Sequence, residues 1–237
     1  MREYKSFEVV YFVDSGQGYK EEVTLGSTAL LPESFIPTKE GYEFVGWRED
    51  TVASNDIVTE KTVGTEPITL YAVFRKLVTL TYNGNGSTSG DTYTSTGYMY
   101  YNNGNTLAAS ITLLENRFTK TNYKFKQWSL GSADGTIYQV GDTISLTGDN
   151  NIYAKWTVIK QTGTYTTYGT AKTHVTKTVT FPEAFETTPT VTFTYTNTNS
   201  KWSITLKSTT KTNFTIDVYL NKSENDYTYT YWTAVVD

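Results

Sequence analysis

The side chains that could carry acid–base or metal chemistry are few in this sequence. There is one histidine, His174, and there is no cysteine. A Ser-His-Asp triad or a zinc site needs an imidazole placed among other catalytic or ligating groups. A single histidine between Thr173 and Val175 is instead typical of a surface strand. These residues predict neither a metal site nor a nucleophilic triad, and disulfides and thiolate chemistry are excluded.

Carboxylate pairs are the other source of hydrolytic chemistry, because a glycoside hydrolase sets two acids across a cleft. Glu183 and Glu186 lie in one predicted turn, Asp217 and residues 224–226 lie elsewhere, and no spacing pairs them. The Asn-Gly-Asn-Gly stretch at 83–86 lacks the following helix of a phosphate-binding loop and predicts a hairpin turn. We therefore predict that the protein is not an enzyme and needs no cofactor.

The composition and charge of the chain limit the classes of partner that it is expected to bind. The net charge is −4 and charged residues make up 19% of the chain, with no basic stripe, so we expect no nucleic-acid binding. The apolar runs are too short to cross a bilayer, and the charged start at residues 1–6 predicts no signal peptide. Aromatic residues reach 15%, including 20 tyrosines. Abundant Tyr, Thr, Val and Phe favour an antiparallel β protein.

Two pairs of aromatic fragments recur along the chain. The first pair reads Gly-Tyr-Glu-Phe-Val-Gly-Trp at 41–47 and Leu-Tyr-Ala-Val-Phe at 70–74. The second pair reads Asn-Tyr-Lys-Phe-Lys-Gln-Trp at 122–128 and Ile-Tyr-Ala-Lys-Trp at 152–156. Because both fragments recur in step, they predict a duplicated module.

The duplication sets the predicted domain organisation. The pattern stops after Trp156, so we predict one module at residues 1–76, a second at 77–157 and a different domain at 158–237. The second module differs from the first by a loop-rich insert at 87–106. The only helical candidate is a short segment at residues 28–34.

The repeated rings allow two interpretations. Trp47, Trp128, Tyr71 and Tyr153 could stack on sugar rings or fill the cores of the modules. We predict core, because a small domain needs large side chains to bury enough apolar area. The aromatic stretch at 98–104 is the better candidate for exposed rings, and an ordinary strand with a glycine turn is the alternative.

The two modules resemble the Listeria–Bacteroides repeat, which is the B-repeat of listerial internalins. The signature is a Gly-Tyr-x-Phe-x-Gly-Trp strand followed by a Leu-Tyr-Ala-x-Trp strand. The first module departs from it at Phe74, and the second at Asn122 and Gln127. The resemblance implies small β-grasp-like domains that act as spacer or adhesive modules on bacterial and phage surface proteins, without catalysis.

The third domain carries short strands separated by turn residues, which predicts an antiparallel sandwich. The domain carries three patterns: Val-x-Phe-x-x-x-Phe-x-x-x-Pro-x-Val at 179–191, Asn-Phe-x-Ile at 213–216 and Trp-x-Ala-Val at 232–235. In these patterns it is similar to the H-type lectin family and to phage tail-fibre tips. The resemblance implies a six-stranded sandwich that assembles as a homotrimer, with sugar sites near the subunit interfaces.

The same resemblance supplies the candidate ligand-binding residues. Lys201 stands where the family has an arginine, and Asn221 and Lys222 stand where it has Trp-His. The position of the family's acidic residue falls near Thr170, beside Tyr168. Because aromatic and acidic partners are missing, specificity for N-acetylgalactosamine is not inherited. The alternative is that each of these residues is a solvated turn residue.

Together these features predict a bacteriophage virion adhesin, a tail or head fibre component at the virion surface. The repeats would serve as spacer or attachment, and the C-terminal sandwich would bind host cell-surface carbohydrate. The expected partners are a host glycan, other virion structural proteins and two further copies of the chain. The alternatives are a fragment of a bacterial cell-surface adhesin and a capsid or tail decoration protein that binds no receptor.

Overall fold

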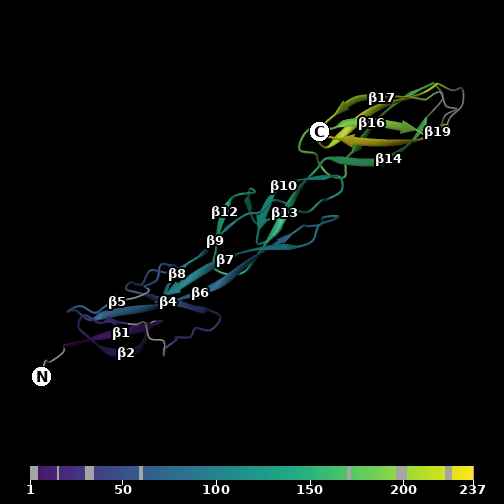
Figure 1. Ribbon diagram of the computed structural model, residues 1–237. Coiled ribbons are helices and arrows are strands. Elements are labelled where there is room, and N and C mark those ends of the chain that lie inside the picture. The colour runs from purple at the N-terminus through teal and green to yellow at the C-terminus, as the bar shows by residue number, and fades with distance from the viewer. Residues whose placement is uncertain are drawn as a thin grey trace. The chain divides into compact units, whose positions relative to one another are not determined.

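The computed structural model describes residues 5–14, 16–29, 35–58, 61–169, 172–195, 202–221 and 226–236 (Figure 1). Throughout these ranges the regular structure is β strand and no helix occurs, which confirms the predicted all-β class. Consequently no described helix is long or apolar enough to cross a membrane. The strands are β1 (Ser6–Val13), β2 (Gly16–Thr24), β3 (Thr28–Ala29), β4 (Glu43–Arg48), β5 (Lys61–Thr62), β6 (Ile68–Asn83), β7 (Tyr93–Asn102), β8 (Asn105–Leu107), β9 (Ala109–Thr112), β10 (Tyr123–Leu130), β11 (Thr136–Tyr138), β12 (Thr143–Leu146), β13 (Asn150–Val158), β14 (Lys160–Gly169), β15 (His174–Thr180), β16 (Thr190–Tyr195), β17 (Trp202–Thr209), β18 (Asn213–Leu220) and β19 (Asp226–Val235).

The chain folds as two compact units. The first comprises Met1–Asn83, Thr92–Glu115 and Leu130–Ile152, and the second comprises Gly84–Asp91, Asn116–Ser129 and Tyr153–Asp237. Each unit is described by itself below.

The first unit is organised around β6, which is 16 residues long. Strand β4 pairs with it antiparallel through a bulge between Phe44 and Gly46, and β7 pairs with it antiparallel from Val73 to Tyr82. Strand β1 pairs antiparallel with β2 but parallel with β6. The predicted antiparallel pairing therefore holds for β2, β4 and β7 but not for the β1–β6 pair, because a connection that crosses over returns the chain in the same direction.

The core of this unit confirms one of the two interpretations of the repeated rings. Trp47 is 2% exposed, and its ring lies 5.0 Å from that of the fully buried Tyr11. Alternate residues of β6, such as Leu70 and Phe74, complete the cluster. The tyrosine of the same motif, Tyr71, is half-buried. The tryptophan is thus core rather than a sugar-stacking platform.

Two local predictions in the first unit need correction. Residues 28–29 form strand β3, which pairs with β5, so the proposed short helix does not begin there, and residues 30–34 lie outside the described ranges. The insert at 87–106 is mostly strand, because β7 and β8 form a hairpin closed by Asn103 and Gly104, both with positive φ. The stretch at 98–104 is accordingly a strand with a glycine turn, as the alternative interpretation held.

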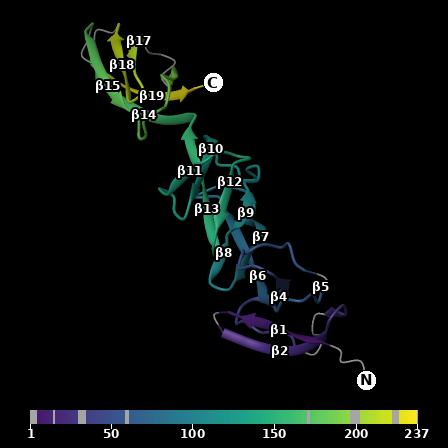
Figure 2. The same cartoon turned by 90° about the vertical axis from the view of Figure 1, so that its left-hand side faces the viewer.

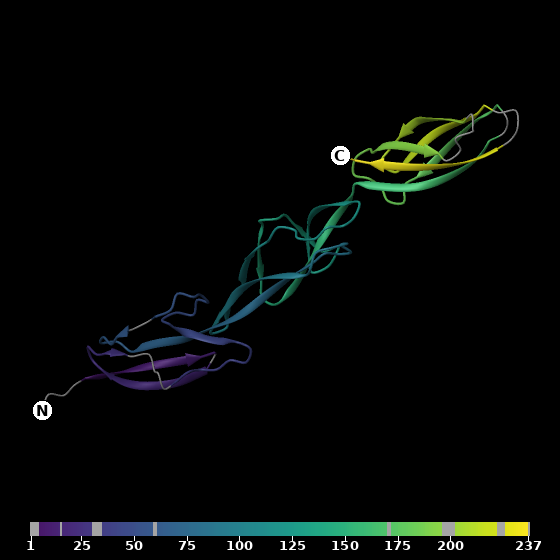
Figure 3. The same cartoon turned by 45° about the vertical axis from the view of Figure 1, so that its right-hand side comes forward.

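The second unit contains the C-terminal sandwich. Six strands form two three-stranded sheets, β14-β19-β16 and β15-β18-β17; β16 is labelled in Figure 1 and the other five strands are labelled in Figure 2. Every pairing in both sheets is antiparallel, as the sequence predicts. The two layers are visible in Figure 3. The predicted six-stranded antiparallel sandwich is confirmed.

Every second side chain of these strands points inward, and these side chains fill the space between the two sheets. Phe214, Ile216, Val218 and Leu220 of β18 point inward, and Trp232 of β19 packs against them. The same unit holds the second motif tryptophan, Trp128, which is fully buried beside Phe118 and Phe125.

Candidate functional site

The structure describes two of the five residues that the lectin resemblance singles out. Tyr168 lies near the end of β14 and is 48% exposed. Asn221 is exposed and directly follows β18. These two strands belong to different sheets of the sandwich. Thr170, Lys201 and Lys222 lie outside the described residues, so the five-residue site stays a prediction.

The outer surface of the β14-β19-β16 sheet carries exposed tyrosines among threonines, and we call it the tyrosine face. On β19, Thr228, Thr230, Trp232 and Ala234 point into the core. The intervening residues therefore point outward, because successive strand side chains alternate between faces. The tyrosine face consists of Tyr168, Tyr229, Tyr231, Val235 and the threonines Thr162, Thr164, Thr166, Thr190, Thr192, Thr194 and Thr233.

Strand register sets the order of groups across the tyrosine face. Tyr231 lies between Thr164 of β14 and Thr194 of β16. Tyr229, which is 56% exposed, lies opposite Thr166. Over the described part of this face the charged side chain is Lys160, at the end beside Val235. The face therefore offers aromatic rings and hydroxyl groups rather than ions.

The outer face of the opposite sheet is different in character. His174 Nδ1 lies 2.6 Å from Asp217 Oδ2, and the imidazole stacks on Tyr219 with ring centroids 4.5 Å apart. Hydrogen bonding to His174, helped by the positive charge of Lys207, lowers the pKa of the Asp217 carboxyl. The Thr176 hydroxyl donates to the same carboxylate. The histidine is indeed an exposed strand residue, and its polar neighbours already engage one another.

The acidic residues of the predicted turn have structural partners. The Tyr123 hydroxyl donates to Glu183 Oε2 at 2.7 Å, and Lys126 forms an ion pair with Glu186. The Glu183 carboxylate raises the pKa of Tyr123, and Lys126 lowers the pKa of Glu186. These carboxylates hold the turn against β10. In the described part of the chain, moreover, no three His, Asp or Glu side chains gather as metal ligands would.

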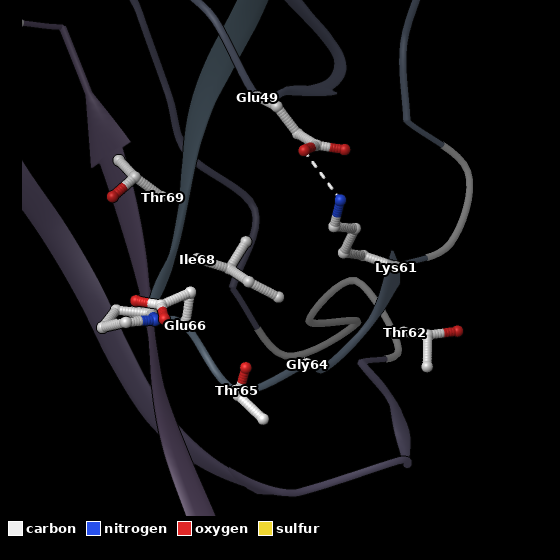
Figure 4. A pocket seen from close by; sticks show the side chains of 9 residues that line it. Glu49, Lys61, Thr62, Gly64, Thr65, Glu66, Ile68 and Thr69 are labelled. Atoms are coloured by element: carbon white, nitrogen blue, oxygen red, sulfur yellow. Dashed lines mark hydrogen bonds and ion pairs between the residues drawn. The ribbon is translucent and has the colours of Figure 1, made fainter.

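An open hollow of about 510 Å³ lies in the first unit (Figure 4). Its walls include Glu49, Lys61, Glu66 and Ile68, and Lys61 reaches across to Glu49 at 2.7 Å. Because this ion pair neutralises two of its charged groups, the hollow offers mainly threonine hydroxyls and the Glu66 carboxylate.

Tyr229 and Tyr231 are not among the binding residues predicted from the sequence. The signal for them is the run at 227–231, where tyrosine and threonine alternate directly before Trp232. Because Trp232 and Ala234 are core residues, the odd-numbered positions of this strand must face outward.

Comparison with known proteins identifies the first two modules. The family model of the Listeria-Bacteroides repeat domain matches residues 7–73 and 79–155, which lie inside the predicted modules. Internalin H of Listeria monocytogenes serovar 1/2a (strain ATCC BAA-679 / EGD-e) is 30% identical over 160 residues, covering 65% of this chain. The chain spans a quarter (25%) of that relative's length. No solved structure matched.

Proposed function

This chain belongs to the Listeria-Bacteroides repeat family, and we propose that it is a non-enzymatic surface adhesin. In this proposal the two repeats act as spacer or attachment modules, and the C-terminal sandwich binds cell-surface carbohydrate. The repeat resemblance supports a place on a bacterial cell surface, where such modules serve as spacers or adhesive domains.

The tyrosine face is the observation that carries the proposal. Tyrosine rings present an apolar surface with a polar hydroxyl at one end, which suits the C–H faces and hydroxyl groups of sugars. Threonine hydroxyls beside them both donate and accept hydrogen bonds. Individual contacts of this kind are weak, so the proposal includes a homotrimer, in which several copies of the face would supply avidity.

A virion fibre component is the second candidate. The similarity of the third domain to H-type lectins and phage fibre tips favours it, because in that setting a terminal sandwich contacts the host. Other virion structural proteins would then be the attachment partners of the repeats.

Binding of the full chain to a glycan array and to bacterial and host cells tests the proposal. Tyr231→Ala removes one exposed ring of the tyrosine face, and Tyr219→Ala removes a ring from the opposite sheet as a matched control. We expect the first variant to lose binding and the second to keep it. A folded wild-type chain that binds neither glycans nor cells would refute the adhesin and leave a decoration protein.

A further inference from the structure

We propose that the tyrosine face binds an extended, uncharged polysaccharide chain that runs along β19, rather than a single terminal sugar. This inference rests on the proposed function and names the class of ligand. It follows from the line of the tyrosines, from the charge of the face and from its area.

The exposed rings follow one another along the sheet. Tyr229 and Tyr231 are two positions apart on one strand, so their Cα atoms are about 6.8 Å apart. Tyr168 continues the series on the neighbouring strand β14, two residues beyond Thr166, which is the partner of Tyr229. One pyranose ring covers one tyrosine, so contact with all three requires consecutive sugars of a chain.

The near absence of charged side chains among the described residues of the face favours a neutral chain as its ligand. Apart from Lys160 at its end, the described side chains of the face are tyrosine, threonine and valine. A polyanionic glycan would need cations distributed along its length, as any polyanion does. A neutral chain needs hydroxyl partners, and threonines lie beside the β19 tyrosines: Thr164 and Thr194 on either side of Tyr231, and Thr166 beside Tyr229.

The area of the face argues against a second protein as the occupant. From the row of Tyr168 to Val235 the face is about 27 Å long, and its three strands make it about 10 Å wide. The resulting projected area is on the order of 300 Å², so even with the relief of its side chains the face is small beside the roughly 800 Å² of accessible surface that each partner buries in a stable protein interface. Threonines also interrupt its apolar part, whereas the core of a protein interface is continuous and apolar. A polysaccharide chain is narrow enough for such a strip.

Calorimetric titration of the full chain with oligosaccharide ladders tests the inference. The probes are β-linked glucose, β-linked N-acetylglucosamine and mannose oligomers of one to six sugars, with polygalacturonate as the anionic comparison. We expect affinity for at least one neutral ladder to rise with length and then level off as the face fills. We also expect Tyr229→Ala and Tyr231→Ala each to weaken the longest ligand about tenfold. Tyr219→Ala, on the opposite sheet, should leave it unchanged.

The outcomes separate this inference from the proposed function. A monosaccharide that binds as tightly as the hexamer, or a preference for the polyanion, overturns the extended neutral ligand and leaves carbohydrate binding intact. Full affinity in both tyrosine variants assigns binding to another surface and overturns the inference. A dimer in light scattering that Tyr231→Ala dissociates would identify a second copy as the occupant, against the area argument. Absence of binding to every ladder overturns the inference, and the adhesin itself falls only if the folded chain also binds no glycan of the array and no cell.

Discussion

Replacement of Asn102 by aspartate tests the hydrogen bonds that join the insert of the second repeat to the first repeat. Asn102 is the last residue of β7 and is fully buried. Its Nδ2 donates to the backbone oxygens of Asp50 and Val52, both at 2.9 Å, in the segment that follows β4. Asn102→Asp keeps the shape of the side chain but turns the donor into an acceptor that faces two acceptors.

The expected loss follows from these contacts. Two hydrogen bonds contribute about 2 kcal/mol together, which Asn102→Ala should remove. An unpaired buried carboxylate costs more, so Asn102→Asp should lower the free energy of unfolding by at least about 3 kcal/mol at pH 7. Burial favours the protonated carboxyl and raises its folded-state pKa above the ordinary value of about 4. The loss should therefore shrink as the pH falls toward 4, where the protonated group can donate one hydrogen bond.

Urea unfolding and calorimetry of the full chain measure the effect, and Asn105 provides the control. Asn105 Nδ2 donates to the Thr51 backbone oxygen at 2.7 Å, but Asn105 is exposed, so water can replace the bond. We expect Asn105→Asp to cost less than about 1 kcal/mol. Equal losses at the two positions, or a loss at Asn102 that does not depend on pH, would refute the argument from burial.

Three further predictions concern stability. A Cβ at Gly163 would lie 2.5 Å from the Trp232 ring, so Gly163→Ala should cost about 1–3 kcal/mol, measured by thermal unfolding of the sandwich. Thr230 is buried and its hydroxyl has no partner among the described residues. Thr230→Val should therefore raise the free energy of unfolding by about 1 kcal/mol. A lower free energy of unfolding in this variant would show that the hydroxyl forms a hydrogen bond. Hydrogen bonding to Lys39 lowers the pKa of Asp14, so the stability from this pair is present above about pH 4 and is lost as the pH falls through the lowered pKa. Because both partners are only half-buried and water screens the pair, Lys39→Met should flatten this part of the acid unfolding profile by less than about 1 kcal/mol.

The fold was predictable where residue pattern alone decides it. The in-step recurrence around Trp47 and Trp128 marks two copies of a core, because an isolated small domain buries its largest rings. The alternation of Phe214, Ile216 and Val218 likewise predicts a strand with one buried face. Neither inference depends on a contact between distant parts of the chain.

The insert could not be predicted in the same way. Its turn residues and its lack of a match in the first repeat suggested loops, yet β7 pairs with β6 over ten residue pairs, from Val73 to Tyr82. The partners of Asn102 lie about fifty positions earlier, and no local pattern announces hydrogen bonds to backbone oxygens. Long-range pairing of this kind is a property of the folded chain.

The orientation of the tyrosine face follows from the residue pattern of β19, although the tyrosines alone suggest the opposite orientation. Tyrosine is the larger and more apolar residue of each Tyr-Thr pair, so the terminal strand suggests buried tyrosines and exposed threonines. Trp232 and Ala234 fix the opposite phase, because a slip of one residue would expose the tryptophan. The sequence therefore indicates which side chains of β19 face outward, provided that Trp232 is taken as the buried residue from which the alternation is counted.

The continuity of β6 bears on how the repeats could serve as a spacer. The strand crosses the predicted module boundary between Lys76 and Leu77 without a break, and both residues pair with β7, Lys76 with Met99 and Leu77 with Tyr98. The division at residues 76/77 stays a prediction, but the covalent link there is a paired strand rather than a free linker. Bending at this point would break ladder hydrogen bonds on both sides of the boundary and pull Asn102 from its buried partners. Since each of these changes exposes unpaired backbone groups, the chain should resist bending at this point.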